Sequence, residues 1–234
     1  MYRRPIGAGC GSPVEENAAI RVYYRRIMRT PFRVEDAAMS DVWRLFAAIE
    51  VPQDVRDRVG QAGRLLADAG WRAKWVTPDR THLTLKFYGN VELERLDALQ
   101  QALREAIERE SAFTLQAAGA GVFPNPRRPR VLWLGLGGHE LQFLNRLQAG
   151  IDRASADLGF PPEARAFHPH LTVARIKPED LSTITGVEHR LAELSAFPAL
   201  PVPVERVTLF RSELRRSGPI YTPLEEFPLN GAGR

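Results

Sequence analysis

The sequence contains one cysteine, three lysines and no long apolar run. The scarcity of cysteine and the absence of a long apolar run each exclude a class of protein. Cys10 stands alone, so the chain can form neither an intramolecular disulfide nor a cysteine-based zinc site. Apolar stretches such as 45–49 and 131–136 are far shorter than the roughly 20 residues of a membrane-spanning helix. The 44% of hydrophobic and 26% of charged residues are typical of a globular chain. We therefore expect a globular protein without a membrane segment, located in a reducing compartment, the cytoplasm.

The net charge of +4 does not by itself indicate binding to nucleic acid. Of the 32 basic residues 29 are arginine, and residues 1–40 hold seven of them with only four acidic residues. The rest of the chain is nearly neutral, with 25 basic and 24 acidic residues. Because residues 1–40 also lack sustained apolar periodicity, we predict a disordered N-terminal extension there. The folded domain, with two lobes, is predicted over residues 41–230.

From Trp43 onward the apolar residues follow regular periods. Spacings of three and four predict amphipathic helices that begin near Pro52, Leu93 and Leu141, and a further helix is predicted to open at Pro178. Strands are predicted at 43–50, 71–76, 81–88, 112–118, 130–136, 170–176, 202–210 and 220–227. The elements fall into two comparable halves. This order predicts an α+β fold of two lobes, each with a small, mostly antiparallel sheet and flanking helices.

A short motif occurs twice, once in each half. It reads His-Leu-Thr-Leu at 82–85 and His-Leu-Thr-Val at 170–173, and both copies lie on predicted strands. Side chains alternate along a strand, so the histidine and threonine of each copy share one face while the apolar pair lies on the other. We therefore expect two pseudo-symmetric lobes that present both polar pairs to one active-site cleft between them.

Two histidines and two threonines suit the cleavage of a phosphodiester. One neutral imidazole can accept a proton from the attacking water while a protonated imidazole donates one to the leaving oxygen. A pKa near 6.5 allows both forms of histidine at neutral pH. The hydroxyls of Thr84 and Thr172 can hold the phosphoryl oxygens as charge develops on them. This scheme requires neither a metal nor another cofactor.

These residues resemble the 2H phosphoesterases, and within them the RNA 2′,3′-cyclic phosphodiesterases, also called LigT-like or 2′-5′ RNA ligase proteins. Besides the two motifs, the resemblance covers RLFAAIEVP (44–52), WVTPDRTHLTLKFYGN (75–90), GVFPNPRRPRVLWLGL (121–136), HPHLTVARIK (168–177) and VTLFRSELRRSGPIYTPLEEFPL (207–229). The first 40 residues have no counterpart in that family.

The resemblance implies hydrolysis of a terminal RNA 2′,3′-cyclic phosphate to a 2′-phosphomonoester, without a metal or cofactor. It implies that His82 is the proton donor, that His170 is the proton acceptor and that Thr84 and Thr172 bind the phosphate. Many relatives also join RNA halves through a 2′-5′ linkage in the reverse direction, so the resemblance raises the same expectation for this chain. The partners expected are RNA ends with a cyclic phosphate, tRNA fragments among them, and the expected state is a monomer.

Arg130 is the preferred candidate for a further substrate contact, because it begins a predicted strand in a segment that matches the family. Phe46, Phe123 and Tyr221 are candidates for stacking on a base, with packing in the core as the alternative for each.

Three alternatives to this interpretation stay open at this point. His82, His168 and His170 could together form a zinc site, although we expect no metal. The chain could cleave another small cyclic or 2′-5′ linked nucleotide. It could also be an RNA-binding protein that catalyses no reaction.

Overall fold

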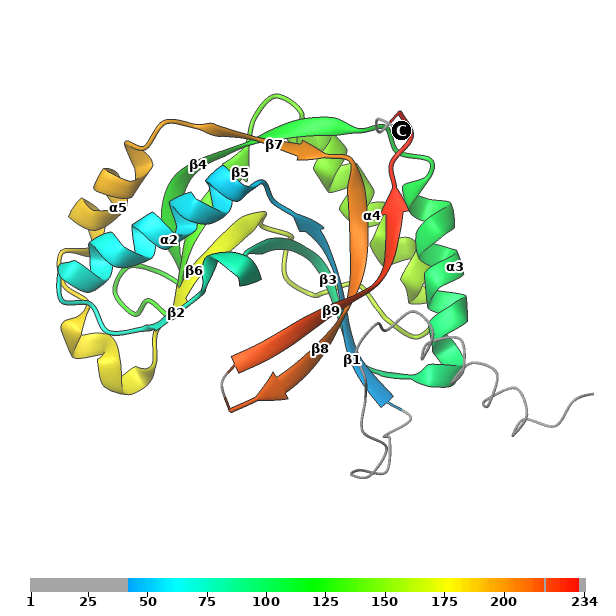
Figure 1. Ribbon diagram of the computed structural model, residues 1–234, viewed down its shortest axis with the longest axis horizontal. Helices are drawn as coiled ribbons and strands as arrows, with labels where there is room; N and C mark the ends of the chain where they lie inside the picture. The colour runs from blue at the N-terminus through cyan, green and yellow to red at the C-terminus, as the bar shows by residue number, and fades with distance from the viewer. Residues whose placement is uncertain (1–41, 217, 232–234) are drawn as a thin grey trace, which may run out of the picture. The chain divides into compact units, whose positions relative to one another are not determined.

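The computed structural model describes residues 42–216 and 218–231, and the extension predicted at 1–40 lies outside these residues. The described chain forms two sheets, in which all paired strands are antiparallel (Figure 1). The first sheet has the order β3 (His82–Glu92), β1 (Val42–Glu50), β8 (Arg206–Arg215), β9 (Gly218–Pro228). The second has the order β2 (Lys74–Trp75), β6 (His170–Arg175), β5 (Val131–Gly137), β4 (Phe113–Phe123), β7 (Leu200–Val204).

Two helices pack on each sheet. The helices are α2 (Gln53–Asp68), α3 (Leu96–Ile107), α4 (Leu141–Ala156) and α5 (Val187–Ser195), with short 3₁₀ helices η1 (Pro78–Arg80), η2 (Leu93–Arg95) and η3 (Pro178–Thr183). Helices α3 and α4 pack on each other and on β9 and β3 of the first sheet. Helices α2 and α5 contact β6, β7 and β4 of the second sheet. Each helix of the described chain is too short or too polar to cross a membrane. The predicted α+β class with two lobes is confirmed.

The two sheets correspond strand by strand. The order β3-β1-β8-β9 matches the order β6-β5-β4-β7, so the two strands that carry the repeated motif occupy equivalent positions. The lobes also exchange a helix. Helix α2 follows β1 of the first sheet but packs on the second, and α4 follows β5 of the second sheet but packs on the first. The lobes are therefore not the two halves of the sequence, as the order of elements suggested, because the chain passes repeatedly between them.

Three predicted elements differ from the structure. The strand predicted at 202–210 is divided at Glu205 into β7 and β8, which belong to different sheets. The helix predicted at Pro178 is the 3₁₀ helix η3, and α5 begins only at Val187, after Gly186 in the left-handed conformation with φ 62°. The strand predicted at 71–76 is reduced to the two residues of β2.

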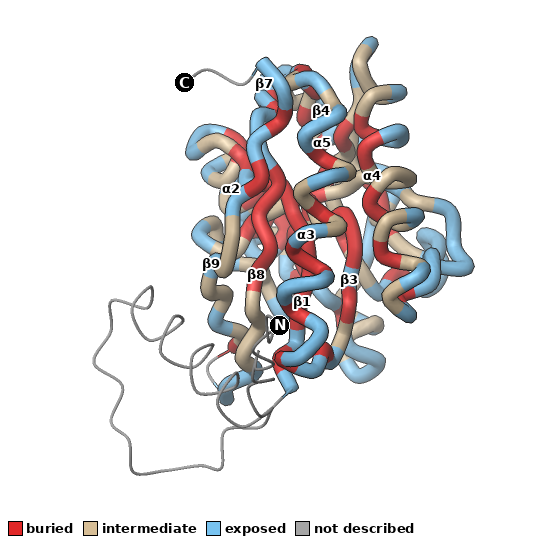
Figure 2. The backbone as a smooth tube through the Cα atoms, turned by 90° about the vertical axis from the view of Figure 1, so that its right-hand side faces the viewer, coloured by how far each residue is buried: buried red, intermediate tan, exposed pale blue. Residues whose placement is uncertain are grey.

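The core lies between each sheet and its helices, and its apolar residues follow the predicted periods. Figure 2 shows buried positions along the central strands and on one side of the helices. In α2 the buried residues include Val55, Val59, Ala62 and Leu66, which recur at intervals of three and four. This pattern gives each helix one apolar stripe toward the sheet.

An ion pair is buried where β3 meets α4. The pairing of β1 with β3 shifts by one residue at Leu85, so Leu85 and Lys86 are both buried and the strand contains a β-bulge. The Lys86 ammonium, 2% exposed, pairs with the Asp152 carboxylate of α4 and donates a hydrogen bond to the Pro161 carbonyl at 3.0 Å. Asp152 also accepts a hydrogen bond from Gln148 at 2.7 Å. These contacts fasten α4 to the strand that carries the first motif.

Replacement of Lys86 by alanine is expected to lower the free energy of unfolding by about 3 kcal/mol. The substitution removes the positive charge that pairs with the Asp152 carboxylate and leaves this largely buried negative charge without its partner. Lys177→Ala is the matched control, since Lys177 and its partner Glu179 are both largely exposed. Loss of that surface pair is expected to cost less than about 1 kcal/mol. Urea unfolding followed by circular dichroism measures both values, and equal losses would contradict the structural role of the buried pair.

Candidate active site

Both copies of the repeated motif line one pocket between the two sheets. The pocket has a volume of about 140 Å³, and His82 and Thr84 reach it from β3 while His170 and Thr172 reach it from β6. The structure therefore brings together the four residues that the repeated motif predicts. Tyr221 of β9 also lines this pocket, so the C-terminal strand contributes to its wall.

Alternation along the strands explains why these side chains face the pocket. In β3 the leucines at 83 and 85 are buried, and in β6 Leu171 and Val173 are buried. The side chains between them point to the opposite face of each sheet. Thr84 pairs with Ala48 of β1, and Thr172 pairs with Trp133 of β5, so each motif strand is held by its central neighbour.

Aromatic rings enclose His82. The imidazole lies 4.9 Å from the ring of Phe46 and 5.2 Å from the ring of Tyr221, measured between centroids, and the planes of His82 and Tyr221 are nearly perpendicular. Burial lowers the pKa of His82 to about 4, while a hydrogen bond with the Arg80 backbone acts in the opposite direction and the charge of Arg175 adds to the lowering. The neutral imidazole is therefore the stable form of His82 in the free protein at neutral pH.

His170 has a similar but more open environment. Its Nδ1 lies 2.7 Å from the carbonyl oxygen of His168 and donates a hydrogen bond to it, which leaves Nε2 as the acceptor nitrogen. The ring of Phe123 lies nearly perpendicular to the imidazole, with centroids 5.1 Å apart. Burial lowers the pKa of His170, and the nearby charges of His168 and Arg175 lower it further against the effect of the hydrogen bond.

The two half-sites are built in the same way. Each motif histidine has a hydrogen bond with the backbone of the residue two positions before it. Beside each lies a pair of aromatic rings from the next two strands of its sheet, Phe46 with Phe210 in the first sheet and Trp133 with Phe123 in the second, both with centroids 5.2 Å apart. This construction fixes two imidazoles in one pocket, one able to accept a proton and the other, once protonated, able to donate one.

The stacking candidates have different surroundings. Phe46 is 2% exposed and belongs to the core, so it has no free face for a base. Tyr221 lines the pocket, and Phe123 packs on Trp133 and His168 beside it. The pocket also contains an aromatic residue that was not predicted from the sequence, Phe87, which is 49% exposed. The bulge at Leu85 turns Phe87 to the same face as Thr84.

The cations that line the pocket are Lys74, Arg80 and Arg175, and Arg130 is not among the lining residues. Arg130 is exposed just before β5, where its backbone bonds Phe123 and Ile176. Within the described residues Arg175 has no carboxylate partner, so its charge is available to an anion. Arg80 and Arg175 were not predicted from the sequence. Arg80 stands two residues before His82 and Arg175 three residues after Thr172, and this closeness to the motifs is the signal that could have identified them.

No three His, Cys, Asp or Glu side chains of residues 42–216 and 218–231 are arranged to hold a metal ion. His168 packs edge-on against Phe123 and Trp133, with ring centroids 5.4 and 5.2 Å apart. The zinc site of His82, His168 and His170 considered above is therefore not formed by these side chains.

The chain belongs to the family described as LigT like Phosphoesterase, which matches residues 49–133 and 139–221. It is 37% identical over 187 residues to the RNA 2′,3′-cyclic phosphodiesterase of Methanothermobacter thermautotrophicus, covering 80% of this chain and 98% of that relative. It is 36% identical over 179 residues to the RNA 2′,3′-cyclic phosphodiesterase of Aeropyrum pernix, covering 75% and 99%.

Solved structures show the same fold. A protein of Thermus thermophilus matches with a TM-score of 0.61 and 31% identity, covering 81% of this chain and all of that one. Escherichia coli LigT in complex with 3′-AMP matches with a TM-score of 0.57 and 27% identity, covering 81% of this chain and 99% of LigT.

The titration of His82 tests the environment derived above. We expect its imidazole C–H signals in NMR spectra, assigned by their loss in His82→Asn, to titrate with a midpoint near pH 4 in the folded protein. In urea the same signals should titrate near the unperturbed value of about 6.5, since unfolding removes the burial. A midpoint near 6.5 in the folded protein would contradict the burial of this ring.

Proposed function

We propose that this chain is an RNA 2′,3′-cyclic phosphodiesterase that opens the cyclic phosphate at an RNA end and leaves a 2′-phosphomonoester. The observation that carries the proposal is the meeting of both His-x-Thr pairs in one pocket with Arg80 and Arg175. The similarity to relatives that bear this name supports the choice of substrate. The complex of LigT with 3′-AMP supports a nucleotide ligand in this fold.

In the proposed mechanism a water molecule attacks the phosphorus atom while Nε2 of His170 accepts its proton. A new P–O bond forms to the water oxygen and the bond from phosphorus to the 3′ oxygen breaks. Protonated His82 donates its proton to that oxygen, so the phosphate stays on the 2′ oxygen. The hydroxyls of Thr84 and Thr172 donate hydrogen bonds to the non-bridging oxygens, and Arg175 offsets the growing negative charge. No step uses a metal or cofactor.

The lowered pKa of His82 is compatible with its role as proton donor. In the free protein the imidazole is neutral at neutral pH, because its pKa is about 4. A cyclic phosphate carries one negative charge, and an anion within a few ångströms stabilises the imidazolium and raises the pKa of both histidines. Binding of the substrate thus favours protonation of the His82 imidazole. Because this imidazole is intrinsically a weak base, it readily transfers the proton to the leaving oxygen.

In the same site an RNA hydroxyl can replace water as the nucleophile that attacks the cyclic phosphate. The product is then two RNA ends joined through a 2′-5′ linkage. We propose that the natural substrates are RNA ends with a cyclic phosphate, including tRNA fragments, and that a monomer acts on them in the cytoplasm. The single pocket that contains both motifs supports a complete site within one chain.

Replacing either histidine tests the proposal. His82→Ala and His170→Ala are each expected to lower kcat/KM for an oligonucleotide with a 2′,3′-cyclic phosphate end by at least about a hundredfold, because each removes one proton transfer. His189→Ala is the matched control, since His189 is an exposed histidine of α5 that does not line the pocket. Thermal unfolding followed by circular dichroism checks that the variants stay folded.

The product and the effect of a chelator separate this proposal from its alternatives. Mass spectrometry and phosphomonoester mapping should show a 2′-phosphate and unchanged turnover in EDTA. A 3′-phosphate would overturn the assignment of the broken bond, and loss of turnover in EDTA would overturn the metal-independent mechanism. RNA binding without any product would support the alternative of a non-catalytic RNA-binding protein.

The pH dependence follows from the two lowered pKa values. The value of kcat/KM reports the free protein, which must carry a proton on His82 and none on His170. Both pKa values lie below 6.5, that of His82 at about 4, so we expect kcat/KM to peak below pH 6.5 and to decline as pH rises further. The bound anion raises both values, so the optimum of kcat should lie at higher pH. Coincident optima above about pH 7 would contradict this account.

A further inference from the structure

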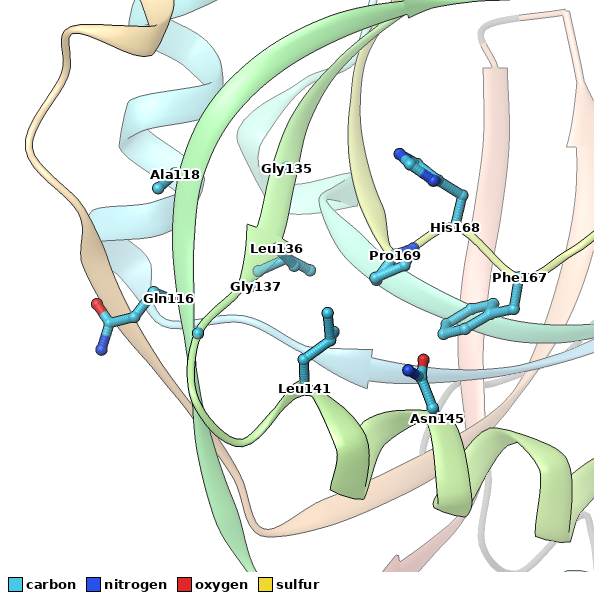
Figure 3. Close-up of a pocket in the computed structure, with 11 residues that line it drawn as sticks. Gln116, Ala118, Gly135, Leu136, Gly137, Leu141, Asn145, Phe167, His168 and Pro169 are labelled. Atoms are coloured by element: carbon cyan, nitrogen blue, oxygen red, sulfur yellow. The ribbon is translucent and has the colours of Figure 1, made fainter.

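A second pocket, of about 340 Å³, lies at the end of the second sheet (Figure 3). Its walls come from the last residues of β5, the first turns of α4 and the segment 167–169, with Gln116 and Ala118 of β4 at one side. In Figure 3 the side chains of Leu141 and Asn145 rise from α4 toward this space, and the ring of Phe167 lies beside Asn145. The proposed mechanism gives this pocket no role.

This pocket lies beside the proposed active site and on the same face of the sheet. His168 and Pro169 line it and directly precede His170, and Gly135, also in its lining, pairs with His170 across β5 and β6. The leucines of β5 at 132, 134 and 136 are buried toward the helices. By alternation Gly137 is then on the face that carries the motif residues.

The chemistry of the lining differs from that of the active site. Among the residues that the structure describes, no Asp, Glu, Lys or Arg lines the second pocket, whereas three cations line the first. Its polar side chains are the amides of Gln116 and Asn145 and the imidazole of His168, and Phe167 adds a flat apolar ring. Within the described residues neither amide side chain has a hydrogen-bond partner. A neutral, planar ligand with hydrogen-bonding edges fits this set, and amides are well suited to the edges of nucleobases.

The space above Gly137 is open. Apart from its two chain neighbours, no atom of the described residues lies within 4 Å of a Cβ atom built on this glycine, and the glycine does not have a positive φ. A side chain at this position would therefore extend into the pocket without strain in the backbone. Gly150 of α4 offers the same freedom but does not line the pocket.

We propose that this pocket binds a nucleobase of the RNA substrate, namely that of the nucleotide on the 5′ side of the one that carries the cyclic phosphate. The inference rests on the proposed function. The terminal nucleoside is joined directly to the reacting phosphate and so stays beside His170. Gly137 lies two residues, or about 7 Å, along β5 from Gly135, the partner of His170, which places the pocket at the next nucleotide. The enzyme then prefers an oligonucleotide end to a cyclic mononucleotide.

The test uses Gly137→Leu, which places a branched apolar side chain in the pocket without changing any motif residue. With the dinucleotide ApA ending in a 2′,3′-cyclic phosphate, kcat/KM is expected to fall about tenfold or more, the loss that corresponds to one stacked base. With adenosine 2′,3′-cyclic phosphate, which has no second base, kcat/KM should change less than about twofold. Gly150→Leu is the matched control and should leave both rates unchanged.

Asn145→Ala gives a second measurement that does not add bulk. It should lower kcat/KM for the dinucleotide about threefold or more and leave the rate with the mononucleotide unchanged. Equal losses on both substrates, or no loss on the dinucleotide in Gly137→Leu, would overturn the proposal. Thermal unfolding establishes that each variant is folded.

A binding measurement separates this proposal from the proposed function. Titration calorimetry with ApA ending in a 2′-phosphate requires no turnover. If the unmodified protein hydrolyses neither cyclic substrate, the proposed function fails. An affinity weaker by about tenfold in Gly137→Leu would then still support the base pocket, and equal affinities of both proteins would overturn it.

Discussion

The alternation of side chains along two strands is the constraint on which the rest of the structure depends. Leu83 and Leu85 in one strand, and Leu171 and Val173 in the other, must be buried beneath helices. Their burial leaves the histidine and threonine of each motif on the opposite face, where the two sheets border one pocket. A shift of one residue in either pairing would exchange the two sets, burying imidazoles and exposing leucines. The same strand register therefore determines both the packing of the core and the position of the site residues.

The exchange of helices holds the two sheets in their positions. Helix α2 packs on the sheet to which its preceding strand does not belong, and α4 does the same in the opposite direction. The ion pair of Lys86 and Asp152 adds a buried contact between α4 and the first motif strand. A pocket lined from both sheets requires that they keep a fixed distance, and these crossed packings supply that restraint.

The sequence predicts local features of this protein well, because burial imposes its period directly on the order of residues. The two motif strands and the stripes of α2, α3 and α4 follow from such periods, and the antiparallel character of the lobes follows from the mixed order of strands and helices. The four motif residues meet in one pocket as predicted. Their chemical roles remain part of the proposal, and the limits of the folded domain, 41–230, remain a prediction.

Features that depend on distant neighbours could not be predicted in this way. Apolar residues lie on both sides of the charged pair Glu205-Arg206, and this short polar interruption does not show that the strands on its two sides join different sheets. Whether Arg130 or Arg175 lines the pocket depends on the register of β5 against β6. The lowered pKa of His82 arises from burial that involves Phe46 and Tyr221, far from it in sequence.

The hairpin of β8 and β9 has a consequence for the order in which the protein can fold. Strand β1 is the first strand of the described chain, yet one of its edges is covered only by β8, which begins at Arg206, near the other end of the described chain. During synthesis from the N-terminus this edge stays open until nearly the whole domain has been made. Tyr221, which closes one wall of the pocket, arrives later still. The nascent chain therefore carries both motif histidines before it has an enclosed site, and contacts of such long range form slowly.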